Sequence, residues 1–251
     1  MPRHPDSDLY RCASCSHAFG FPREHETYDD DYYEIEHRRW FDHPNTALFD
    51  QIAEAIPPAS AVLDAGCGKG DFLRHLHAQR QDLKLTGLDF TANENTNGIR
   101  YLQGDVMTLD PGKFDAVVSL AVIEHIPDVT EFVRRLYSFV RPGGVVAIMT
   151  VNESSLLYRL ARATRPVTPI TFNRLYSAHH VHHFTRQSLE SLLQSRGARI
   201  ERSWTHNMPL AAIDIPAEGI AGAVLRAGMW GVCVAGDRTG MAYLQTVIAR
   251  T

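Results

Sequence analysis

Residues 61–71 read A-V-L-D-A-G-C-G-K-G-D, and this stretch decides the fold. A short apolar run ends in an acid, Asp64, and a glycine then falls at every second position, at Gly66, Gly68 and Gly70. Because glycine has no Cβ, the chain can turn with positive φ, and a ligand can lie against the backbone at the start of the next helix. The stretch therefore predicts a buried strand, a tight turn and a helix that together hold a small molecule.

The spacing of the glycines excludes two common nucleotide sites. A dinucleotide fingerprint requires a third glycine at position 71, where this chain has Asp71. A phosphate loop requires serine or threonine after its lysine, but Lys69 is followed by Gly70. The turn must therefore serve another kind of ligand.

Further segments downstream repeat the plan of strand, turn and helix. One predicted strand, residues 83–89, ends in Asp89, 25 residues after Asp64, about the spacing at which an acid reaches a ribose in nucleotide-binding α/β folds. The apolar period of residues 129–140 predicts a helix. The other predicted strands are 99–105, 114–120, 145–151, 198–204 and 241–249.

Five motifs in order carry a resemblance to a known family. They are D-x-G-x-G-x-G at 64–70, G-L-D at 87–89, G-D-V at 104–106, F-D-x-V-x-x-x-x-V-x-E-H at 114–125 and R-P-G-G at 141–144. Over roughly residues 48–200 the chain resembles the class I S-adenosylmethionine (SAM) dependent methyltransferases, in particular the small-molecule enzymes of the UbiG-like, type 11 and type 23 groups. The resemblance implies an α/β, doubly wound (Rossmann-like) fold with a seven-stranded, mostly parallel sheet and an antiparallel last strand.

The resemblance also implies a cofactor site for SAM, with S-adenosylhomocysteine as product. In the family the glycine turn packs against the methionine part, and the acid at the position of Asp64 helps to hold its ammonium group. The acids at the positions of Asp89 and Asp105 serve the ribose and the adenine amino group. The expected cofactor residues are Asp64, Gly66, Gly68, Gly70, Asp89, Phe90, Asp105, Val106 and Leu120. One departure is that only nine residues separate Asp89 from Ile99, so the usual helix there is expected to be reduced or lost.

The composition narrows the class of protein. The chain has 251 residues and a net charge of −4, without a basic stripe interleaved with aromatics, which disfavours a nucleic-acid partner. Its first residues lack the apolar run of a signal peptide, and its four cysteines are expected to be reduced, so a cytoplasmic location is expected. Residues 219–236 are short for a span and contain Arg226, so we expect a packed or lid helix rather than a membrane span. A homodimer is compatible with these features.

Residues 1–47 are expected to form an extension, and residues 48–251 the methyltransferase domain, with lid insertions at about 152–184 and 207–238.

The extension contains a lone C-x-x-C, Cys12 and Cys15, whereas a zinc site needs four ligands. Nearby histidines leave a Cys₂His₂ site conceivable; they are His4, His17 and His25. The motif resembles only half of the zinc ribbon found in some relatives, so a vestigial knuckle without metal is preferred.

Residues 28–41 form an acidic, aromatic run with two interpretations. One is a surface helix whose apolar side chains are partly packed. The other is a lid helix, common in the family, whose aromatic faces would attract the sulfonium by cation–π interaction. On the second interpretation the expected substrate contacts are Tyr32, Tyr33, His37 and Trp40.

A histidine cluster occupies residues 176–185, Y-S-A-H-H-V-H-H-F-T. If extended, this segment places His180 and His182 on one face. The cluster could supply a general base or substrate contact, play a structural role, or bind metal, and we prefer these in that order. The candidate bases are His180, His125 and His182, with His179 as a substrate contact. For His125 and its neighbour Glu124 the alternative is structural: Glu124 pairs with an arginine and His125 caps the next helix.

These observations predict a SAM-dependent methyltransferase of small-molecule biosynthesis. The acceptor is expected to be an oxygen, or else a nitrogen, of a small hydrophobic or aromatic metabolite, with part of its pocket in the apolar residues 207–236. The alternative is a non-catalytic SAM-binding subunit or regulator, which would keep Asp64, Asp89 and Asp105 but need no base. A short-chain oxidoreductase is set aside because no Tyr-x-x-x-Lys is present.

Overall fold

The structure is a computed structural model that describes residues 4–5, 7–22, 39, 42–96, 98–213 and 219–251. It divides into two compact units. The sheet unit comprises Asn45–Thr150, Leu189–Ser203 and Thr246–Thr251, and the hairpin unit comprises Met1–Pro44, Val151–Ser188 and Trp204–Gln245. Each unit is described by itself below.

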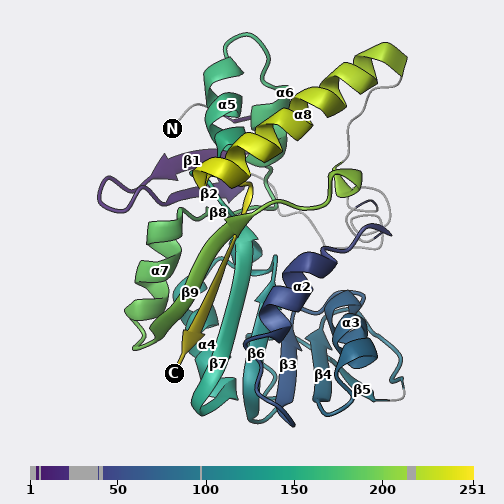
Figure 1. Ribbon diagram of the computed structural model, residues 1–251. Helices are drawn as coiled ribbons and strands as arrows, with labels where there is room; N and C mark the ends of the chain where they lie inside the picture. Colours follow the sequence, from purple (N-terminus) through teal and green to yellow (C-terminus); the bar gives the residue numbers. More distant parts are fainter. Residues whose placement is uncertain (1–3, 6, 23–38, 40–41, 97, 214–218) are drawn as a thin grey trace. The chain divides into compact units, whose positions relative to one another are not determined.

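The seven strands of the main sheet are β3 (Ala61–Ala65), β4 (Lys84–Asp89), β5 (Ile99–Gln103), β6 (Phe114–Leu120), β7 (Val140–Val151), β9 (Arg199–His206) and β10 (Leu244–Arg250). Their order is β5-β4-β3-β6-β7-β10-β9. The pairs β3/β4, β3/β6, β4/β5 and β6/β7 are all parallel. The last strand, β10, runs against the others (Figure 1), which confirms the predicted α/β class.

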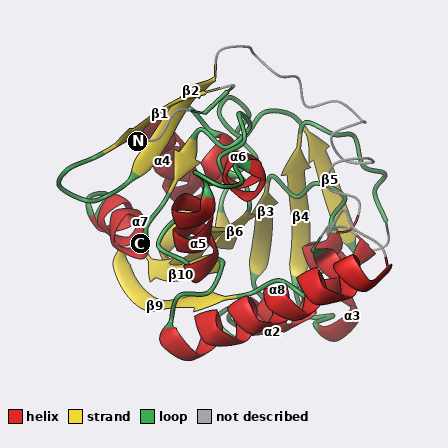
Figure 2. Cartoon of the chain, turned by 90° about the horizontal axis from the view of Figure 1, so that it is seen from above, coloured by secondary structure: helices red, strands yellow, loops and turns green. Residues whose placement is uncertain are grey.

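Three helices cover the faces of this sheet. Helices α2 (Thr46–Ala53) and α3 (Asp71–Gln79) pack on each other, and α3 lies over β4 and β5. Helix α4 (Val129–Phe139) packs on β6 from the opposite face (Figures 1 and 2). Strand β3 is covered on both faces, so Val62 and Leu63 are fully buried and the acid Asp64 is only 2% exposed. Figure 2 shows β3, β4, β5 and β6 side by side, so their carboxyl ends meet at one edge.

Two local features depart from the usual plan or from our predictions. Strand β7 begins at Val140, five residues before the predicted start, and carries the R-P-G-G turn as an irregularity in its pairing with β6. No helix lies between β4 and β5 among the described residues, as predicted from the short connection. That connection folds back on β5 instead: Thr96 bridges Ile99, and Oδ1 of Asn95 accepts a hydrogen bond of 2.6 Å from the amide of Tyr101.

The hairpin unit contains the antiparallel strands β1 (Ser7–Arg11), β2 (Ala18–Pro22) and β8 (His182–His183), in the order β1-β2-β8. Its helices are α5 (Leu156–Thr164), α6 (Ile170–Leu175) and α8 (Gly219–Thr239). Helix α7 (Arg186–Gln194) and the short turns η2 (Ile123–His125) and η3 (Leu210–Ala212) complete the described elements. Aromatic residues fill the core of the hairpin unit, with Tyr158, Phe172 and Tyr176 fully buried. None of the described helices combines the length and the apolar character needed to span a bilayer.

The candidate cofactor site

The glycine turn after β3 adopts the conformation that its sequence predicts. Gly66, Gly68 and Gly70 have φ of +80°, +50° and +79°, a region that side chains rarely adopt. A Cβ at Gly66 would overlap Val122, and one at Gly70 would overlap the hydroxyl of Tyr101. The glycines are therefore required both by the backbone angles and by the side chains packed against the turn.

Asp64 is an acid buried away from solvent, with 2% of its surface exposed. Its Oδ1 has no hydrogen-bond partner among the described residues. Burial, followed by repulsion from Asp89 and Asp71, raises the pKa of Asp64 to about 8. A buried carboxyl group with an unpartnered oxygen, next to the glycine turn, is an environment in which a cationic ligand gains most.

Asp89 lies at the end of β4 with both carboxylate oxygens fixed. Oδ2 accepts a hydrogen bond of 2.8 Å from the amide of Gly68, and Oδ1 accepts one of 2.9 Å from the amide of Thr91. The side chain of Asn93 donates to the carbonyl of Gly68 at 2.7 Å, so the connection without a helix still braces the turn. The neighbouring Phe90 is 66% exposed and presents its ring at the same strand end.

The third acid, Asp105, follows β5 and caps a turn. Its Oδ1 accepts a hydrogen bond of 2.7 Å from the amide of Met107, and the following Val106 is buried. The amide of Gly104 donates to the carbonyl of Asp89 at 2.8 Å, which ties the ends of β4 and β5 together. The predicted cofactor residues of β3, β4 and β5 are thus joined by backbone hydrogen bonds at one edge of the sheet.

Strand β6 ends at the half-buried Leu120 and continues into a strained residue. Ala121 has φ of +56°, and its amide is held by the carbonyl of Met149 at 3.0 Å. A non-glycine residue in this region is uncommon and is maintained only where its surroundings fix it. Sequence reasoning missed this strain, which places Val122 over the glycine turn.

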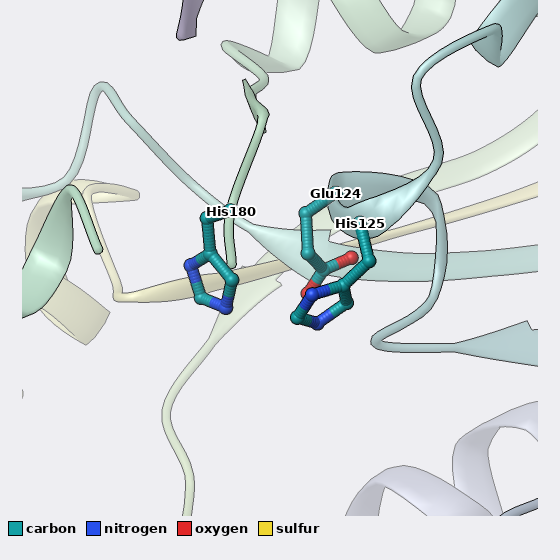
Figure 3. A group of neighbouring side chains, drawn as sticks. All are labelled: Glu124, His125 and His180. Atoms are coloured by element: carbon teal, nitrogen blue, oxygen red, sulfur yellow. The ribbon is translucent and has the colours of Figure 1, made fainter. Parts of the chain in front are cut away.

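Glu124 and His125 lie side by side on η2 (Figure 3), with one carboxylate oxygen and one ring nitrogen within 4.8 Å. Glu124 is fully buried, and its Oε2 accepts a hydrogen bond of 2.8 Å from the hydroxyl of Thr150. Burial raises the pKa of Glu124 to about 7. His180, also drawn in Figure 3, belongs to the hairpin unit and is described with it.

The structural alternative for these two residues was wrong in both parts. The hydrogen bond described for Glu124 comes from a threonine rather than an arginine. Helix α4 is capped by Asp128, whose side chain accepts from the amide of Glu131, so His125 is not the cap. His125 remains a candidate base beside the strand end.

The histidine cluster of the hairpin unit is less extended than predicted. Residues 178–179 form a turn, so His179 lies in that turn and only His182 and His183 are in a strand. The hydrogen-bond distance between Nε2 of His17 and Nδ1 of His182 is 2.9 Å. His180 follows the turn, and its amide donates to the carbonyl of Ser177 at 3.1 Å.

His183 is fully buried, and its Nδ1 lies 3.2 Å from the hydroxyl of Tyr158. Burial and the neighbouring histidines lower the pKa of His183 to about 3, so the ring is neutral at physiological pH. The same physical causes lower the pKa of His17 to about 4. His183 is therefore a structural residue, which was the second of the three hypotheses for the cluster.

The C-x-x-C lies in the turn between β1 and β2. Hydrogen bonds to the neighbouring Cys15 lower the pKa of Cys12. The nearby histidines have other partners: Nε2 of His4 lies 3.1 Å from the carbonyl of Asn173, and His17 contacts His182. His25 lies outside the described residues, so the described part of the chain does not test whether a Cys₂His₂ metal site forms.

Four predicted substrate contacts lie outside the described residues; they are Tyr32, Tyr33, His37 and Trp40.

Sequence reasoning also missed a charged cluster in the hairpin unit. Glu153 is buried and forms ion pairs with Arg11 and Arg162, and it accepts a hydrogen bond of 2.7 Å from the hydroxyl of Tyr176. The only signal for it was an acid two residues after the predicted strand 145–151.

The residues around the glycine turn fit SAM. The unpaired carboxyl of Asp64 suits an ammonium group, and the fixed carboxylate of Asp89 keeps lone pairs that can accept from a ribose diol. These features lie within the sheet unit alone.

Comparison with known proteins agrees with this site. A family model described as "Methyltransferase domain" (Methyltransf_23) matches residues 34–203, well over half of the chain. The ubiquinone biosynthesis O-methyltransferase of Rickettsia conorii is 33% identical over 128 residues, which are 47% of this chain and 43% of the relative. The chain therefore spans less than half the length of this curated relative.

Two solved structures share the fold. A chain in the complex of the Haloferax volcanii Trm112 methyltransferase activator with a methyltransferase has a TM-score of 0.61 at 17% identity, covering 90% of this chain and 99% of that one. The Burkholderia thailandensis 1,6-didemethyltoxoflavin-N1-methyltransferase, with its substrate and S-adenosylhomocysteine bound, has a TM-score of 0.56 at 16% identity, covering 98% and 99%. With the matched family model and the motifs at the sheet edge, these findings show that the chain belongs to the class I SAM-dependent methyltransferase family.

Proposed function

We propose that this protein transfers a methyl group from SAM to an oxygen atom, or else a nitrogen atom, of a small hydrophobic or aromatic metabolite. The observation that carries the proposal is the arrangement at the sheet edge. The glycine turn directly follows Asp64, whose Oδ1 has no partner among the described residues, and its Gly68 amide donates to the fixed carboxylate of Asp89. This arrangement is suited to a ligand with an ammonium group at one end and a diol further along the molecule.

When bound, the cofactor supplies an electrophilic sulfonium methyl group. Asp64 would face its ammonium group, and Asp89 would face the hydroxyls of its ribose. Asp105 and the exposed ring of Phe90 would border the adenine. Most of the rate of such a transfer comes from keeping the acceptor in line at attack distance, so positioning matters more than any one catalytic group.

A hydroxyl or ammonium acceptor must lose a proton as the new bond to carbon forms. We propose that a histidine takes this proton, because its pKa lies near neutrality. His125 is the candidate in the sheet unit, because it lies in η2, the short turn that follows β6. His180 is the candidate in the hairpin unit, whereas His182 is engaged with His17 and is a weaker one. His179 is retained as a substrate contact.

An oxygen acceptor is preferred for two reasons. The matched relative is named an O-methyltransferase, although the match covers less than half of it. A hydroxyl or phenol also requires the proton acceptor that the histidines offer. The pocket expected in residues 207–236 is supported only in part, because Leu225 and Trp230 are each more than half exposed.

The test is calorimetric titration of the purified protein with SAM and with S-adenosylhomocysteine. We expect micromolar binding that falls about 100-fold in Asp89→Ala, because hydrogen bonds to a charged group are lost. Asp110→Asn, a change to an exposed acid on a surface loop, serves as the matched control and should bind normally. A folded sample that binds neither ligand would refute the proposal.

Once binding is established, acceptors are screened in matched pairs. Each pair offers the same aromatic ring with a hydroxyl or an amino group. Transfer to the hydroxyl that is lost in His125→Ala or His180→Ala, while SAM binding is retained, would assign the base. Binding of SAM with no transfer to any class of small acceptor would favour the alternative of a non-catalytic SAM-binding subunit.

A further inference from the structure

The turn between β1 and β2 holds two thiols, those of Cys12 and Cys15, at the tip of the hairpin (Figure 1). The amide of Cys12 donates to the carbonyl of His17 at 2.8 Å, and its carbonyl accepts from the amide of Ser16 at 3.1 Å. Ser16 has φ of +59°, which is uncommon for a residue other than glycine. Backbone hydrogen bonds on both sides of this residue therefore close the turn around the two cysteines.

Two side chains of the hairpin unit hold the turn from outside. The guanidinium of Arg11 donates to the carbonyl of Ser16 at 2.9 Å and also pairs with the buried Glu153. The hydroxyl of Thr185 donates to the carbonyl of Cys15 at 3.3 Å. The backbone on which the thiols are mounted is thus tied to a buried carboxylate and to the residue that precedes α7.

The two sulfur atoms lie within hydrogen-bond reach of each other. Sγ of Cys12 accepts from the amides of Cys15 and Ser14 and from the thiol of Cys15, and these hydrogen bonds lower the pKa of Cys12. Both side chains are partly exposed. The first and fourth residues of a tight turn lie within about 7 Å of each other, a Cα separation that a disulfide can bridge. The turn therefore presents one activated thiol and a second thiol close enough to react with it.

The remaining cysteines, Cys67 and Cys233, have the opposite character. Burial, followed by repulsion from Asp64 and Asp89, raises the pKa of Cys67. Burial, followed by repulsion from Asp237, raises the pKa of Cys233. Because the thiolate is the nucleophile, both of these thiols should react slowly. The chain thus contains its own reference against which the reactivity of Cys12 can be measured.

The described residues favour oxidation over metal binding for this pair of thiols. A structural zinc site takes four ligands. In the part of the chain that the structure describes, no group of three or more candidate metal ligands includes Cys12 or Cys15. His17, which follows them in the turn, contacts His182 instead. A disulfide, in contrast, needs only the two sulfur atoms that the turn already brings together.

We propose that Cys12 and Cys15 are a redox-active dithiol that a low-molecular-weight disulfide, such as oxidised glutathione, converts to an intramolecular disulfide. The thiolate of Cys12 attacks one sulfur of the oxidant, so a mixed disulfide forms and one glutathione thiolate leaves and takes up a proton. The thiol of Cys15 then loses its proton and attacks the sulfur of Cys12, and the second glutathione leaves as a thiol. Two electrons pass from the protein dithiol to the oxidant, which is reduced to two thiols.

The first test is alkylation of the reduced, full-length chain with iodoacetamide at pH 7, followed by mass spectrometry of its peptides. We expect Cys12 to react about tenfold or more faster than Cys67 and Cys233 in the folded protein. In urea the turn and the burial are both lost, so the three rates should become similar. This comparison separates an effect of the folded turn from an effect of the C-x-x-C sequence alone.

The second test is equilibration with mixtures of reduced and oxidised glutathione, after which the free thiols are trapped and counted. Cys12 and Cys15 should be lost together in one transition, while Cys67 and Cys233 remain reduced. Cys15→Ser should stop at the mixed disulfide of Cys12 with glutathione. Cys233→Ser is the matched control and should titrate as the wild type does. Circular dichroism confirms that each variant is folded.

Any of three results would overturn the proposal. One is a folded protein in which Cys12 reacts no faster than Cys67 and Cys233. Another is a glutathione titration in which Cys12 and Cys15 are not lost as a pair. The third is a purified chain with one bound zinc ion that must be removed before Cys12 reacts, since the thiols would then be metal ligands. Neither test needs SAM, so failure of the methyltransferase proposal would leave these results unaffected.

Discussion

Nε2 of His17 and Nδ1 of His182 lie 2.9 Å apart, and the centroids of the two rings are 5.2 Å apart. One ring must donate the shared hydrogen bond and the other must accept it, so the contact requires at least one neutral imidazole. Burial, followed by repulsion from His182, lowers the pKa of His17 to about 4. The pair links the residue before β2 to β8. Protonation of these rings at acid pH should therefore weaken this contact.

His17→Phe should make the protein less sensitive to acid. Unfolded histidine has a pKa of about 6.5, so between that value and the folded value the unfolded chain binds more protons. The stability from this neutral ring is complete above the unfolded pKa and falls as the pH is lowered through the interval. We expect the wild type to lose about 2 kcal/mol more than the variant between pH 7.5 and pH 5. Urea unfolding at both pH values measures this, with the exposed His43→Phe as control; equal losses would contradict it.

Glu124→Gln should alter the pH dependence in the opposite sense. Burial raises the pKa of Glu124 to about 7, so the folded state binds more protons than the unfolded one above the usual carboxyl pKa. Stability therefore falls as the pH rises toward 7 and beyond. Relative to the wild type, the variant should gain about 3 kcal/mol of unfolding free energy between pH 4.5 and pH 8.

Glutamine keeps an oxygen that can accept from Thr150, so the hydrogen bond should survive in Glu124→Gln. The exposed Glu54→Gln is the control and should follow the wild-type profile. Parallel profiles for the wild type and Glu124→Gln would show that the carboxyl of Glu124 is already ionised near pH 5, and so that burial does not raise its pKa.

Asp64 should release a proton when SAM binds. With a pKa of about 8 its carboxyl is mostly protonated at pH 7, and a cationic ammonium group nearby favours the ionised form. Binding at pH 7 should release close to one proton, seen as a difference between binding enthalpies in buffers of unlike ionisation enthalpy. In Asp64→Asn the enthalpies should agree between buffers. A wild-type protein with no buffer dependence would refute this role for Asp64.

Gly70→Ala should weaken both the fold and SAM binding. The φ of +79° is unfavourable for alanine by about 1–2 kcal/mol, and the added Cβ would overlap Tyr101. We expect a lower melting temperature and an affinity for SAM reduced by about tenfold or more. Gly228→Ala, in an open position of α8, is the control and should bind SAM normally. Normal affinity in Gly70→Ala would remove the glycine turn from the site.

Glu153→Ala should destabilise the hairpin unit. It leaves Arg11 and Arg162 without the carboxylate that they share, and losing one partner of a buried ion pair costs about 3–5 kcal/mol. Tyr176→Phe removes one hydrogen bond of the same cluster and should cost only about 1 kcal/mol. Hydrogen exchange should show the loss in β1 and α5 first. A smaller effect of Glu153→Ala than of Tyr176→Phe would contradict this order.

The sequence predicted the features that depend on local pattern. Strand β6 was predicted with its observed bounds, because a short, mostly apolar run between polar turns marks a buried strand. The positive φ of Gly66, Gly68 and Gly70 followed from the glycines themselves. The loss of the helix between β4 and β5 followed from a connection too short to contain one.

Features that depend on distant contacts were not predicted. The partner of Glu124, Thr150, is 26 residues away on β7, and no periodicity connects the two. Strand β8 has two residues, too few to show an alternating pattern, so the approach of His17 to His182 could not be anticipated. The positive φ of Ala121 is imposed by its neighbours rather than by its own residue type.

The connection between β4 and β5 has a consequence for self-association. Strand β5 lies at the end of the sheet order, and the open edge of a sheet is a template on which another chain can add a strand. In this protein the chain occupies part of that edge itself, since Asn95 accepts from the amide of Tyr101 and Thr96 bridges Ile99. A connection too short to form a helix thus occupies part of the open edge, which should limit the pairing of β5 with a strand of another molecule.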